Sequence, residues 1–274
     1  MIHAEISGNK YWKIFYNVEN YLKEKPQNPR IITFGGAFSN HIFAVSALGK
    51  LLEIQTLGII RGDELENNWR ENPTLKRANQ NGMQFRFISR TDYREKGKLI
   101  ENLQSEFPEA LIIPEGGTNK LAVEGIKFML GAETKEFNYL CCAVGTGGTL
   151  AGISKFAENH QKVLGFKVVK DDSLENRIFE LSGRKNFQVI DSSEKGYGKF
   201  SDETIRFINE FYERFNIPLE PIYTGKMFRK LFELIEADFF PKDSKILAFH
   251  TGGLQGIAGV NDKLRKKGKE LINF

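Results

Sequence analysis

Short apolar segments alternate with longer segments of helical periodicity along almost the whole chain, and this alternation restricts the fold more than any other feature. Expected strands occupy residues 30–34, 54–60, 84–88, 111–113, 139–144, 163–169, 188–191 and 245–249. Expected helices occupy residues 39–52, 73–81, part of 93–107, 120–132, 150–158, 174–183, 202–215, 226–237 and 254–267. The pattern predicts an α/β protein with mostly parallel, helix-flanked sheets, in which ligands bind beyond the carboxyl ends of strands.

The bulk properties agree with an enzyme-sized globular protein and exclude several other classes. The 274 residues suffice for one large domain or two modest ones, although no linker or internal repeat marks a boundary. No apolar run approaches the roughly 20 residues that span a bilayer, so we expect no membrane partner. The net charge of +4 depends on a basic patch at residues 263–269, which is more typical of a solvated last helix than of a nucleic-acid interface.

Cysteine and histidine usage bears on compartment and metal binding. Cys141 and Cys142 are adjacent and are the two cysteines of the chain, so a disulfide framework is not expected. The N-terminal residues also lack a basic segment followed by an apolar one. These features predict a reducing, cytoplasmic location. The cysteines and the four histidines have no metal-ligand spacing, so no protein-built metal site is expected.

One lysine stands where a helix is expected to begin. Ser7 is a suitable N-cap residue, and Gly8-Asn9-Lys10 follows it, with Lys13 one turn further along the same helix face. Positive potential at a helix N-terminus favours the uncharged amine that Schiff-base chemistry requires. Taken alone, the segment is much more typical of a solvated lysine in a turn.

A glycine-rich segment follows the expected strand at 139–144. Its residues Gly145-Thr146-Gly147-Gly148-Thr149 open the next helix, where several backbone N–H groups can converge on an anion. The full dinucleotide-binding spacing G-x-G-x-x-G is missing, and no acidic ribose partner stands at the expected offset. A small phosphate is therefore the better prediction, with a plain strand-to-helix turn as the alternative.

Two further segments offer polar side chains at helix starts. Ser39-Asn40 follows a Gly-Gly turn and could hold a substrate carboxylate and a ring hydroxyl, or simply cap the helix. Tyr223-Thr224-Gly225-Lys226 joins strand-like Pro221-Ile222 to a helix. Tyr223 there suits an acid or base, and Thr224 suits a hydrogen bond to a ring nitrogen. The alternative for Tyr223 is a half-buried aromatic of the core.

Other turns are expected near the same edge of the sheets. His250-Thr251-Gly252-Gly253 is a strand-end turn that would face the same crevice. Pro114–Asn119 is a further glycine turn, in which Glu115 is expected to be structural. Tyr197, between two glycines, needs no special role on its own.

In this order the segments resemble those of the tryptophan-synthase-β-like (fold type II) pyridoxal phosphate enzymes. Within that group they resemble the 1-aminocyclopropane-1-carboxylate (ACC) deaminase and D-cysteine desulfhydrase family, over nearly the whole chain. The resemblance implies pyridoxal 5'-phosphate as cofactor, a small amino-acid substrate and a homodimer. It also implies a large cofactor-binding domain of residues 1–12 and 118–274, with a small domain of residues 13–117 inserted into it.

The resemblance also implies roles for individual residues. Lys10 would form the Schiff base beside Asn9, and Lys13 would assist with the phosphate. The phosphate itself would be held by the residues Gly145, Thr146, Gly147, Gly148 and Thr149. Asn40 would bond the ring hydroxyl of the cofactor, and Ser39 would bind the substrate carboxylate or relay a proton.

Three further residues would face the substrate. Tyr223 would act as acid or base, His41 would join the substrate-binding set, and Tyr197 resembles a second active-site tyrosine of the family. Catalysis would therefore rest on Lys10, Ser39 and Tyr223.

Two threonines favour one branch of the resembled family. ACC deaminases carry glutamate and leucine at the positions of Thr224 and Thr251, whereas desulfhydrases carry threonine at both. Threonine can only hydrogen-bond a neutral pyridine nitrogen, which gives a weaker electron sink than a protonated one. That suffices for β-elimination of thiolate but suits cyclopropane ring opening poorly. The prediction is a D-cysteine desulfhydrase, a lyase of amino-acid metabolism that forms pyruvate, hydrogen sulfide and ammonia.

Several alternatives stay open at this point. They include an ACC deaminase, which is hydrolytic, and another lyase, deaminase or racemase of D-amino acids. A pyridoxal-phosphate-binding protein with little catalysis and a nucleotide-binding α/β domain are the remaining two.

The chain departs from the resembled pattern in two places. Nine residues precede Lys10, where the family has several tens, so one cleft wall is expected to be thinner. Trp12 replaces an arginine between the two motif lysines, and any ion pair of that arginine is lost.

Overall fold

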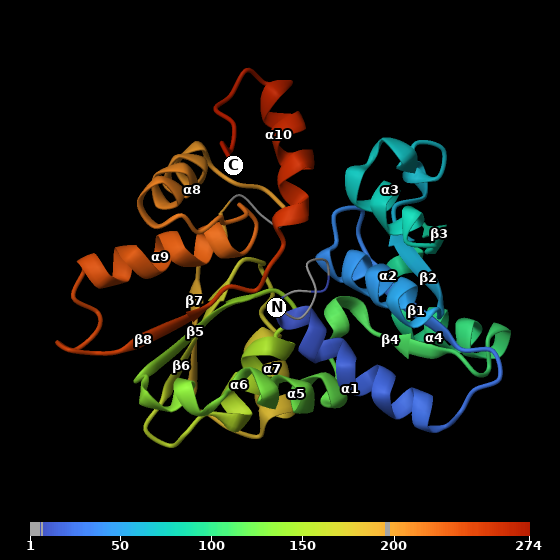
Figure 1. The fold of residues 1–274 in the computed structure, drawn as a ribbon, viewed down its shortest axis with the longest axis horizontal. Coiled ribbons are helices and arrows are strands. Elements are labelled where there is room, and N and C mark those ends of the chain that lie inside the picture. Colours follow the sequence, from blue (N-terminus) through green and yellow to red (C-terminus); the bar gives the residue numbers. More distant parts are fainter. Residues whose placement is uncertain (1–5, 7, 195–197) are drawn as a thin grey trace. The chain divides into compact units, whose positions relative to one another are not determined.

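The computed structural model describes residue 6, residues 8–194 and residues 198–274. The chain divides into two compact units, unit 1 (Met1–Ala122) and unit 2 (Val123–Phe274), each with its own parallel sheet (Figure 1). The predicted domains, residues 1–12 with 118–274 and residues 13–117, have other bounds than these units and stay a prediction. Helix α1 (Asn9–Lys23) runs unbroken past residue 12 within unit 1, which also includes residues 118–122.

Unit 1 is built on a four-stranded parallel sheet. Its strand order is β3 (Gln84–Ile88), β2 (Gln55–Arg61), β1 (Arg30–Gly35) and β4 (Leu111–Ile113). Its helices are α1, α2 (Asn40–Leu52), α3 (Pro73–Gln80) and α4 (Lys96–Glu106). Strand β1 is buried from its second residue onward, as its apolar sequence RIITFG predicts for an inner parallel strand.

Unit 2 repeats this plan with a second four-stranded parallel sheet. Its strand order is β7 (Phe187–Asp191), β6 (Lys162–Lys167), β5 (Tyr139–Val144) and β8 (Ile246–Phe249). Its helices are α6 (Gly148–Phe156), α7 (Leu174–Ser182), α8 (Asp202–Phe215), α9 (Thr224–Glu236) and α10 (Ile257–Arg265). Helix α5 (Lys120–Ile126) crosses the boundary between the units.

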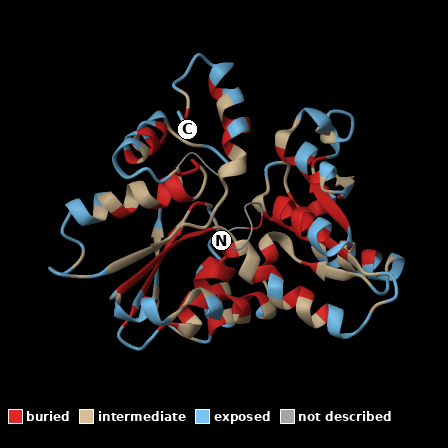
Figure 2. Ribbon diagram, in the orientation of Figure 1, coloured by how far each residue is buried: buried red, intermediate tan, exposed pale blue. Residues whose placement is uncertain are grey.

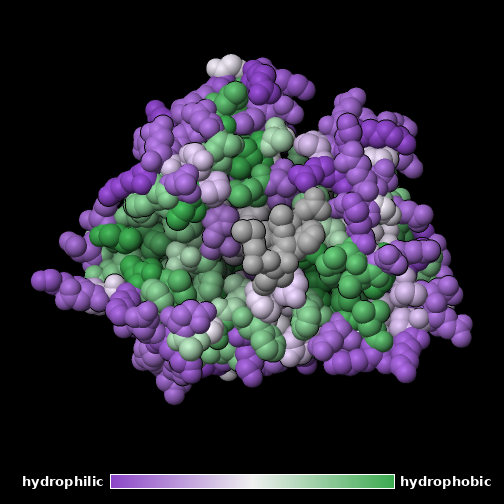
Figure 3. Space-filling model, in the orientation of Figure 1, coloured by the Kyte–Doolittle hydropathy of each residue, from purple (hydrophilic) through white to green (hydrophobic). Residues whose placement is uncertain are grey.

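The core of unit 2 is densest along β5, all six residues of which are buried (Figure 2). Cys141 and Cys142 lie in this strand as free cysteines, and burial raises the pKa of the Cys141 thiol to about 12. Helices α8 and α9 contribute an aromatic cluster through Phe211, which contacts Phe228 and Phe232. Hydrophilic residues line the outer rim of the face in Figure 3, as expected for helices that bury one face.

The strand order fixes where a ligand can approach each unit. In unit 1 the chain proceeds from β1 to β2 on one side and later adds β4 on the other side of β1. In unit 2, β6 and β8 flank β5 in the same way. Ligands of open parallel sheets bind at such reversals, beyond the strand ends. Residues 36–39 and 114–119 follow the two strands of the reversal in unit 1, and residues 145–147 and 250–253 follow those of unit 2.

The predicted fold class is confirmed, and three local predictions are wrong. The expected helix 120–132 ends at Ile126, after Gly125, and continues as separate 3-10 turns around an extended Gly131, because glycine is a poor helix former. The expected helix 254–267 begins with a 3-10 turn and is α-helical only from Ile257 to Arg265. Residues 221–223 form a turn rather than the end of a strand.

Candidate functional site

The first cluster of predicted site residues lies at the N-terminus of α2 in unit 1. Ser39 is the N-cap residue, and its hydroxyl accepts a hydrogen bond from the Ile42 N–H at 3.3 Å. The capping role that the sequence allowed for Ser39 is therefore present. Asn40 is the first residue of the helix and, like Ser39, is half-buried. Backbone N–H groups at this helix start and the two side chains together suit a carboxylate.

His41 is buried directly beneath this helix start. Its Nε2 lies 2.8 Å from the Thr33 hydroxyl, which donates to the Ile113 carbonyl at 2.9 Å. Burial, followed by the positive charges of Lys10 and Lys13, holds the pKa of His41 well below its ordinary value. The ring is therefore neutral near pH 7, and its exposed fraction is only 2%.

The lysine motif opens α1, as predicted. The N-cap residue is Gly8, in place of the Ser7 that the sequence predicts, and Ser7 lies outside the described residues. Lys10 is half-buried, and its Nζ donates to Asn9 Oδ1 at 3.1 Å.

Lys13 is much more deeply placed, with 2% of its surface exposed. Its Nζ donates to the Gly116 carbonyl at 2.6 Å and to the Thr118 hydroxyl at 2.9 Å. These bonds tie α1 to the turn after β4, which sequence reasoning did not foresee. The phosphate role of Lys13 stays a prediction.

Unit 2 carries the predicted phosphate cradle between β5 and α6. Gly147 has φ +90°, and a Cβ atom there would lie 3.0 Å from Ile178 Cγ1 and 3.2 Å from Leu174 Cδ1. Glycine is thus required by both conformation and space, since α7 packs against the turn. Helix α6 begins at Gly148 and Thr149 is buried in its first turn, so the backbone N–H groups and helix dipole suit a phosphate. The residues present therefore fit a phosphate-bearing cofactor.

A buried carboxylate organises the turn that carries Tyr223 and Thr224. Both oxygens of Glu220 accept backbone N–H groups, from Ile222, Tyr223 and Thr224, each at 2.7 Å. Burial raises the pKa of the Glu220 carboxyl, and these three donors oppose the shift. The backbone N–H groups of residues 222–224 thus bond Glu220 instead of a neighbouring strand, and Pro221 has no N–H group to donate. For these two reasons the expected strand is a turn.

Glu220 escaped the sequence analysis, although one signal was present. An acidic residue shortly before a helix start satisfies the free N–H groups there and complements the helix dipole. Here Thr224 completes the arrangement, because its hydroxyl accepts the Glu220 N–H at 3.0 Å. Thr224 is fully buried, whereas Thr251 is half-buried at the turn after β8. A cofactor role for either threonine stays a prediction.

Three predicted segments come together inside unit 2. A Cβ atom on Gly145 would lie 3.2 Å from the Tyr223 hydroxyl, so the tyrosine lies against the cradle. His250 Nε2 lies 2.8 Å from the Pro218 carbonyl, and its Nδ1 accepts the Gly252 N–H at 3.2 Å. Because β8 also pairs with β5, the cradle, the Tyr223 turn and the Thr251 turn share one end of the sheet. Tyr197 lies outside the described residues.

Glu115 has the structural role that the sequence favoured. Its carboxylate pairs with the Lys96 ammonium on α4.

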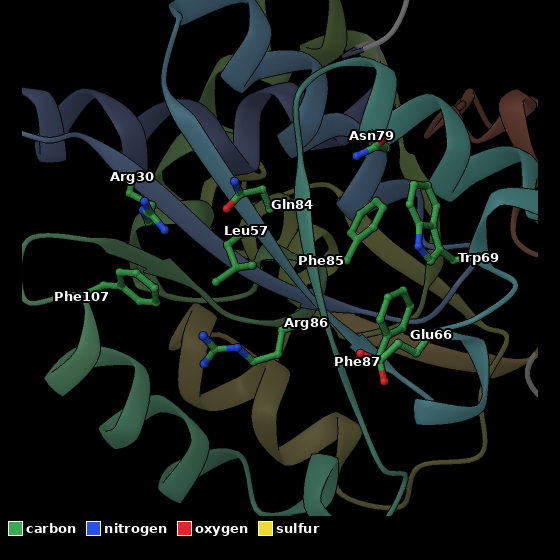
Figure 4. A pocket seen from close by; sticks show the side chains of 10 residues that line it. All are labelled: Arg30, Leu57, Glu66, Trp69, Asn79, Gln84, Phe85, Arg86, Phe87 and Phe107. Carbon is green, nitrogen blue, oxygen red and sulfur yellow. The ribbon is translucent and has the colours of Figure 1, made fainter.

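A cavity of about 480 Å³ lies elsewhere, along the edge strand β3 of unit 1 (Figure 4). Trp69, Phe85 and Phe107 line it together with Arg30 and Arg86. Its ten labelled residues include none of the predicted site residues. The Arg86 guanidinium is already paired with Glu106, with two nitrogen–oxygen contacts at 2.7 and 2.8 Å. We assign no chemistry to this cavity.

Two absences concern the part of the chain that the structure describes. No group of three or more histidine, cysteine, aspartate or glutamate side chains is arranged there to hold a metal ion. No helix among those residues is long and apolar enough to cross a bilayer.

The fold and these residues define a class: an α/β protein with a glycine-rich turn suited to a phosphate at one sheet reversal and a lysine at a helix start. The chain belongs to the pyridoxal-phosphate-dependent enzyme family, whose model matches residues 5–252. The family resemblance and the cofactor inferred from the sequence are both confirmed by this match.

Named relatives place the chain more finely within this family. It is 30% identical to a Pyrococcus horikoshii protein whose name gives 1-aminocyclopropane-1-carboxylate deaminase as a provisional activity, over 94% of this chain and 84% of the relative. It is 27% identical to the Arabidopsis thaliana mitochondrial bifunctional D-cysteine desulfhydrase/1-aminocyclopropane-1-carboxylate deaminase, over 95% of this chain and 72% of the relative.

A solved structure agrees with these relatives. The crystal structure of an ACC deaminase homologue is similar with a TM-score of 0.79 and 28% identity, over 95% of this chain and 84% of that chain. The sequence and structural similarities therefore point to the same branch of the family.

Proposed function

We propose that the protein is a pyridoxal-phosphate-dependent lyase that converts D-cysteine and water to pyruvate, hydrogen sulfide and ammonia. The observation that carries the proposal is the pair of threonines at the two turns near the cradle, Thr224 and Thr251, where an ACC deaminase would carry glutamate and leucine. Without a carboxylate to keep the ring nitrogen protonated, the electron sink is weak, which favours a substrate with a good leaving group. A thiolate on the β-carbon is such a group.

The chain supplies distinct contacts to cofactor and substrate in this proposal. Lys10 attaches the cofactor, Asn40 bonds its ring hydroxyl, and the N-terminus of α6 with Gly147 and Thr149 holds its phosphate. When bound, the cofactor supplies an electron sink for the bond broken at the α-carbon. Tyr197 is proposed as a second tyrosine facing the substrate.

Proton transfer and orientation are the work of the remaining side chains. The Lys10 amine or the Tyr223 hydroxyl takes the proton from the substrate α-carbon, as sulfide leaves the β-carbon. Ser39 and the first N–H groups of α2 hold the substrate carboxylate, which keeps the α-carbon oriented toward that base. Water then releases ammonia and pyruvate.

A second candidate is deamination of 1-aminocyclopropane-1-carboxylate to 2-oxobutanoate and ammonia. The names of the relatives favour it, including the bifunctional Arabidopsis protein. The two threonines argue against it as the main activity. Other D-amino-acid substrates with a leaving group on the β-carbon fit the same chemistry.

We further propose that the protein works as a homodimer in a reducing compartment such as the cytoplasm. The two free, buried cysteines support the compartment, since neither is arranged in a disulfide. Sedimentation analysis of the loaded protein tests the oligomeric state.

The first experiment measures sulfide release from D-cysteine with added pyridoxal phosphate, for the wild type and Lys10→Ala. Lys23→Ala is the matched control, because Lys23 is an exposed residue at the end of the same helix. We expect sulfide from the wild type and from Lys23→Ala and none from Lys10→Ala. Equal sulfide from all three would refute the assignment of Lys10.

The same samples separate the two candidate substrates. Borohydride reduction followed by mass spectrometry should place a pyridoxyl group on Lys10. A pyridoxyl group on Lys10, together with 2-oxobutanoate from the cyclopropane substrate and no sulfide from D-cysteine, would refute the desulfhydrase activity. It would show instead that the protein is an ACC deaminase.

A further inference from the structure

Two helices that carry predicted site residues meet the same short turn in unit 1. The turn Pro114–Asn119 follows β4 and contacts α1, α2 and β1. Lys13 of α1 donates to Gly116 and Thr118, and Asn17 of α1 donates to Asn119 Oδ1 at 3.2 Å. One face of the turn is therefore fastened to the helix that begins with Lys10.

His41 of α2 makes a second contact with the turn. A Cβ atom on Gly117 would lie 2.9 Å from His41 Cε1 and 3.3 Å from Nδ1, and Gly117 has φ +66°. The imidazole edge thus rests on the backbone of the turn, at a distance that only glycine allows. Lys10, Lys13 and His41 are also close enough for both lysine charges to act on the ring.

The hydrogen bonds of Thr33 fix the form of this imidazole. The threonine hydroxyl has one hydrogen, which it gives to the Ile113 carbonyl, so it must accept from His41 Nε2. His41 is therefore the neutral tautomer with hydrogen on Nε2. Among the described residues Nδ1 is buried without a hydrogen-bond partner, and it lies 3.3 Å from where a Cβ atom on Gly117 would be.

We propose that His41 is a positioning residue, and that it acts with Lys13 by holding the turn Pro114–Asn119 between contacts from two helices, α1 and α2. These contacts fix the position of Lys10, at the start of α1, relative to Ser39 and Asn40 at the start of α2. We call this arrangement the grip. The inference rests on the proposed function only in taking Lys10 as the lysine that binds the cofactor. It replaces a direct contact of His41 with substrate, which a ring with 2% of its surface exposed is poorly placed to make.

The first test needs no cofactor. Nitrogen NMR of the uniformly ¹⁵N-labelled full chain reports the tautomer of each histidine. We expect His41 to carry its hydrogen on Nε2 and to stay uncharged in mildly acidic buffer. A hydrogen on Nδ1, or a charged ring at neutral pH, would overturn the hydrogen-bond arrangement on which the grip depends.

The second test compares two substitutions at the same position. His41→Gln places an amide N–H near the former Nε2 and can still donate to Thr33, whereas His41→Asn is too short. The readout is the rate at which pyridoxal phosphate labels Lys10, trapped with borohydride and counted by mass spectrometry. We expect near wild-type labelling for the glutamine variant and a loss of about tenfold for the asparagine variant, since displacements near 1 Å can cost up to 100-fold.

A direct substrate contact would give a different result. Both variants would then label Lys10 normally and raise KM for the substrate, and the proposal would fall. Equal labelling loss in both variants would also refute it, because the Thr33 bond would then be irrelevant. If His41→Asn does not fold, Thr33→Val serves instead, since it removes the acceptor of the Nε2 hydrogen and keeps the size of the side chain.

Gly117 of the turn has a matched control in Gly82, which lies between α3 and β3. Gly117→Ala and Gly82→Ala both place alanine at positive φ in unit 1, but the space around Gly82 is open. We expect slower Lys10 labelling only in Gly117→Ala, and equal labelling in the two variants would contradict the grip. If wild-type Lys10 is not labelled at all, the proposed function fails, whereas the NMR test of His41 stands independently.

Discussion

Unit 1 and unit 2 each use a buried charged side chain to hold a turn beside predicted site residues, and the two side chains have opposite charge. In unit 1 a buried ammonium, Lys13, donates to carbonyl and hydroxyl oxygens of the turn after β4. In unit 2 a buried carboxylate, Glu220, accepts the N–H groups of the turn before α9. Lys13 thus organises its turn by donating hydrogen bonds to oxygen atoms of that turn. Glu220 organises its turn by accepting hydrogen bonds from N–H groups of that turn.

Unit 1 has a histidine in the first turn of α2 (His41) and unit 2 has one directly after β8 (His250), and their ring nitrogens are satisfied differently. His250 donates from Nε2 to Pro218 and accepts at Nδ1 from Gly252. His41 donates from Nε2 to Thr33, its Cε1 lies nearest Gly117, and its Nδ1 has no hydrogen-bond partner among the described residues. Both ring nitrogens of His250 are therefore satisfied by backbone groups, one in its own turn and one at Pro218, whereas one ring nitrogen of His41 is left unsatisfied.

The largest effect is expected where the anion of unit 2 is neutralised. Glu220→Gln leaves one oxygen for three N–H donors and turns an amide N–H toward them. Because buried donors without partners cost about 1–3 kcal/mol each, we expect a loss of about 3 kcal/mol in the free energy of unfolding. Urea unfolding measures it, with Glu236→Gln as the control, since Glu236 is exposed at the end of the same helix. Equal midpoints for the two variants would mean that Glu220 does not organise the turn.

The two threonines of unit 2 are expected to differ in role, with Thr224 acting on stability and Thr251 on activity. Thr224→Val leaves the Glu220 N–H without its acceptor and should cost about 1–2 kcal/mol of stability. Thr251→Val, at a half-buried position, should leave stability nearly unchanged and instead lower the rate of sulfide release. Urea unfolding and the sulfide assay together separate the roles. The reverse pattern would make Thr224 the ligand of the cofactor and Thr251 the structural threonine.

The cradle of unit 2 is built from backbone and should be sensitive to a single added carbon. Gly147→Ala would bring Cβ to 3.0 Å from Ile178 and would also be strained at φ +90°. We expect cofactor affinity to fall about tenfold, which corresponds to roughly 1.4 kcal/mol. Gly183→Ala is the matched control in unit 2, with positive φ but open space. The dissociation constant for pyridoxal phosphate, measured by titration, checks this, and a loss of equal size in the control would contradict it.

Much of the fold follows from the sequence because its signals are local. Strands β3 and β4 and helix α8 match the expected ranges residue for residue, since apolar runs and helical periodicity need no distant partner. The glycines of the cradle could likewise be recognised, because a positive φ is encoded by residue type. The exceptions are segments such as 221–223, whose backbone bonds go to a side chain rather than to a neighbouring strand.

The groups that hold the site together could not be predicted in the same way. Lys13 bonds a turn 103 residues away along the chain, and Thr33 bonds Ile113 at a separation of 80 residues. A lysine one turn into a helix and a threonine inside a strand carry no signal of such partners. Glu220 was within reach, because its partners lie two to four residues away, but its burial depends on the assembled core of unit 2.

The last effect concerns the charge of His41, and its dependence on pH distinguishes His41 from the exposed His160. The folded state keeps His41 uncharged well below pH 6.5, whereas the unfolded chain binds a proton there, so the contribution of His41 to stability falls as pH drops below about 6.5. The loss approaches about 1.4 kcal/mol per pH unit for one proton. His41→Gln should remove this slope, while His160→Gln, at an exposed position, should keep it. Urea unfolding at several pH values below 6.5 measures the slope, and an unchanged slope in His41→Gln would mean that the ring is charged in the folded protein.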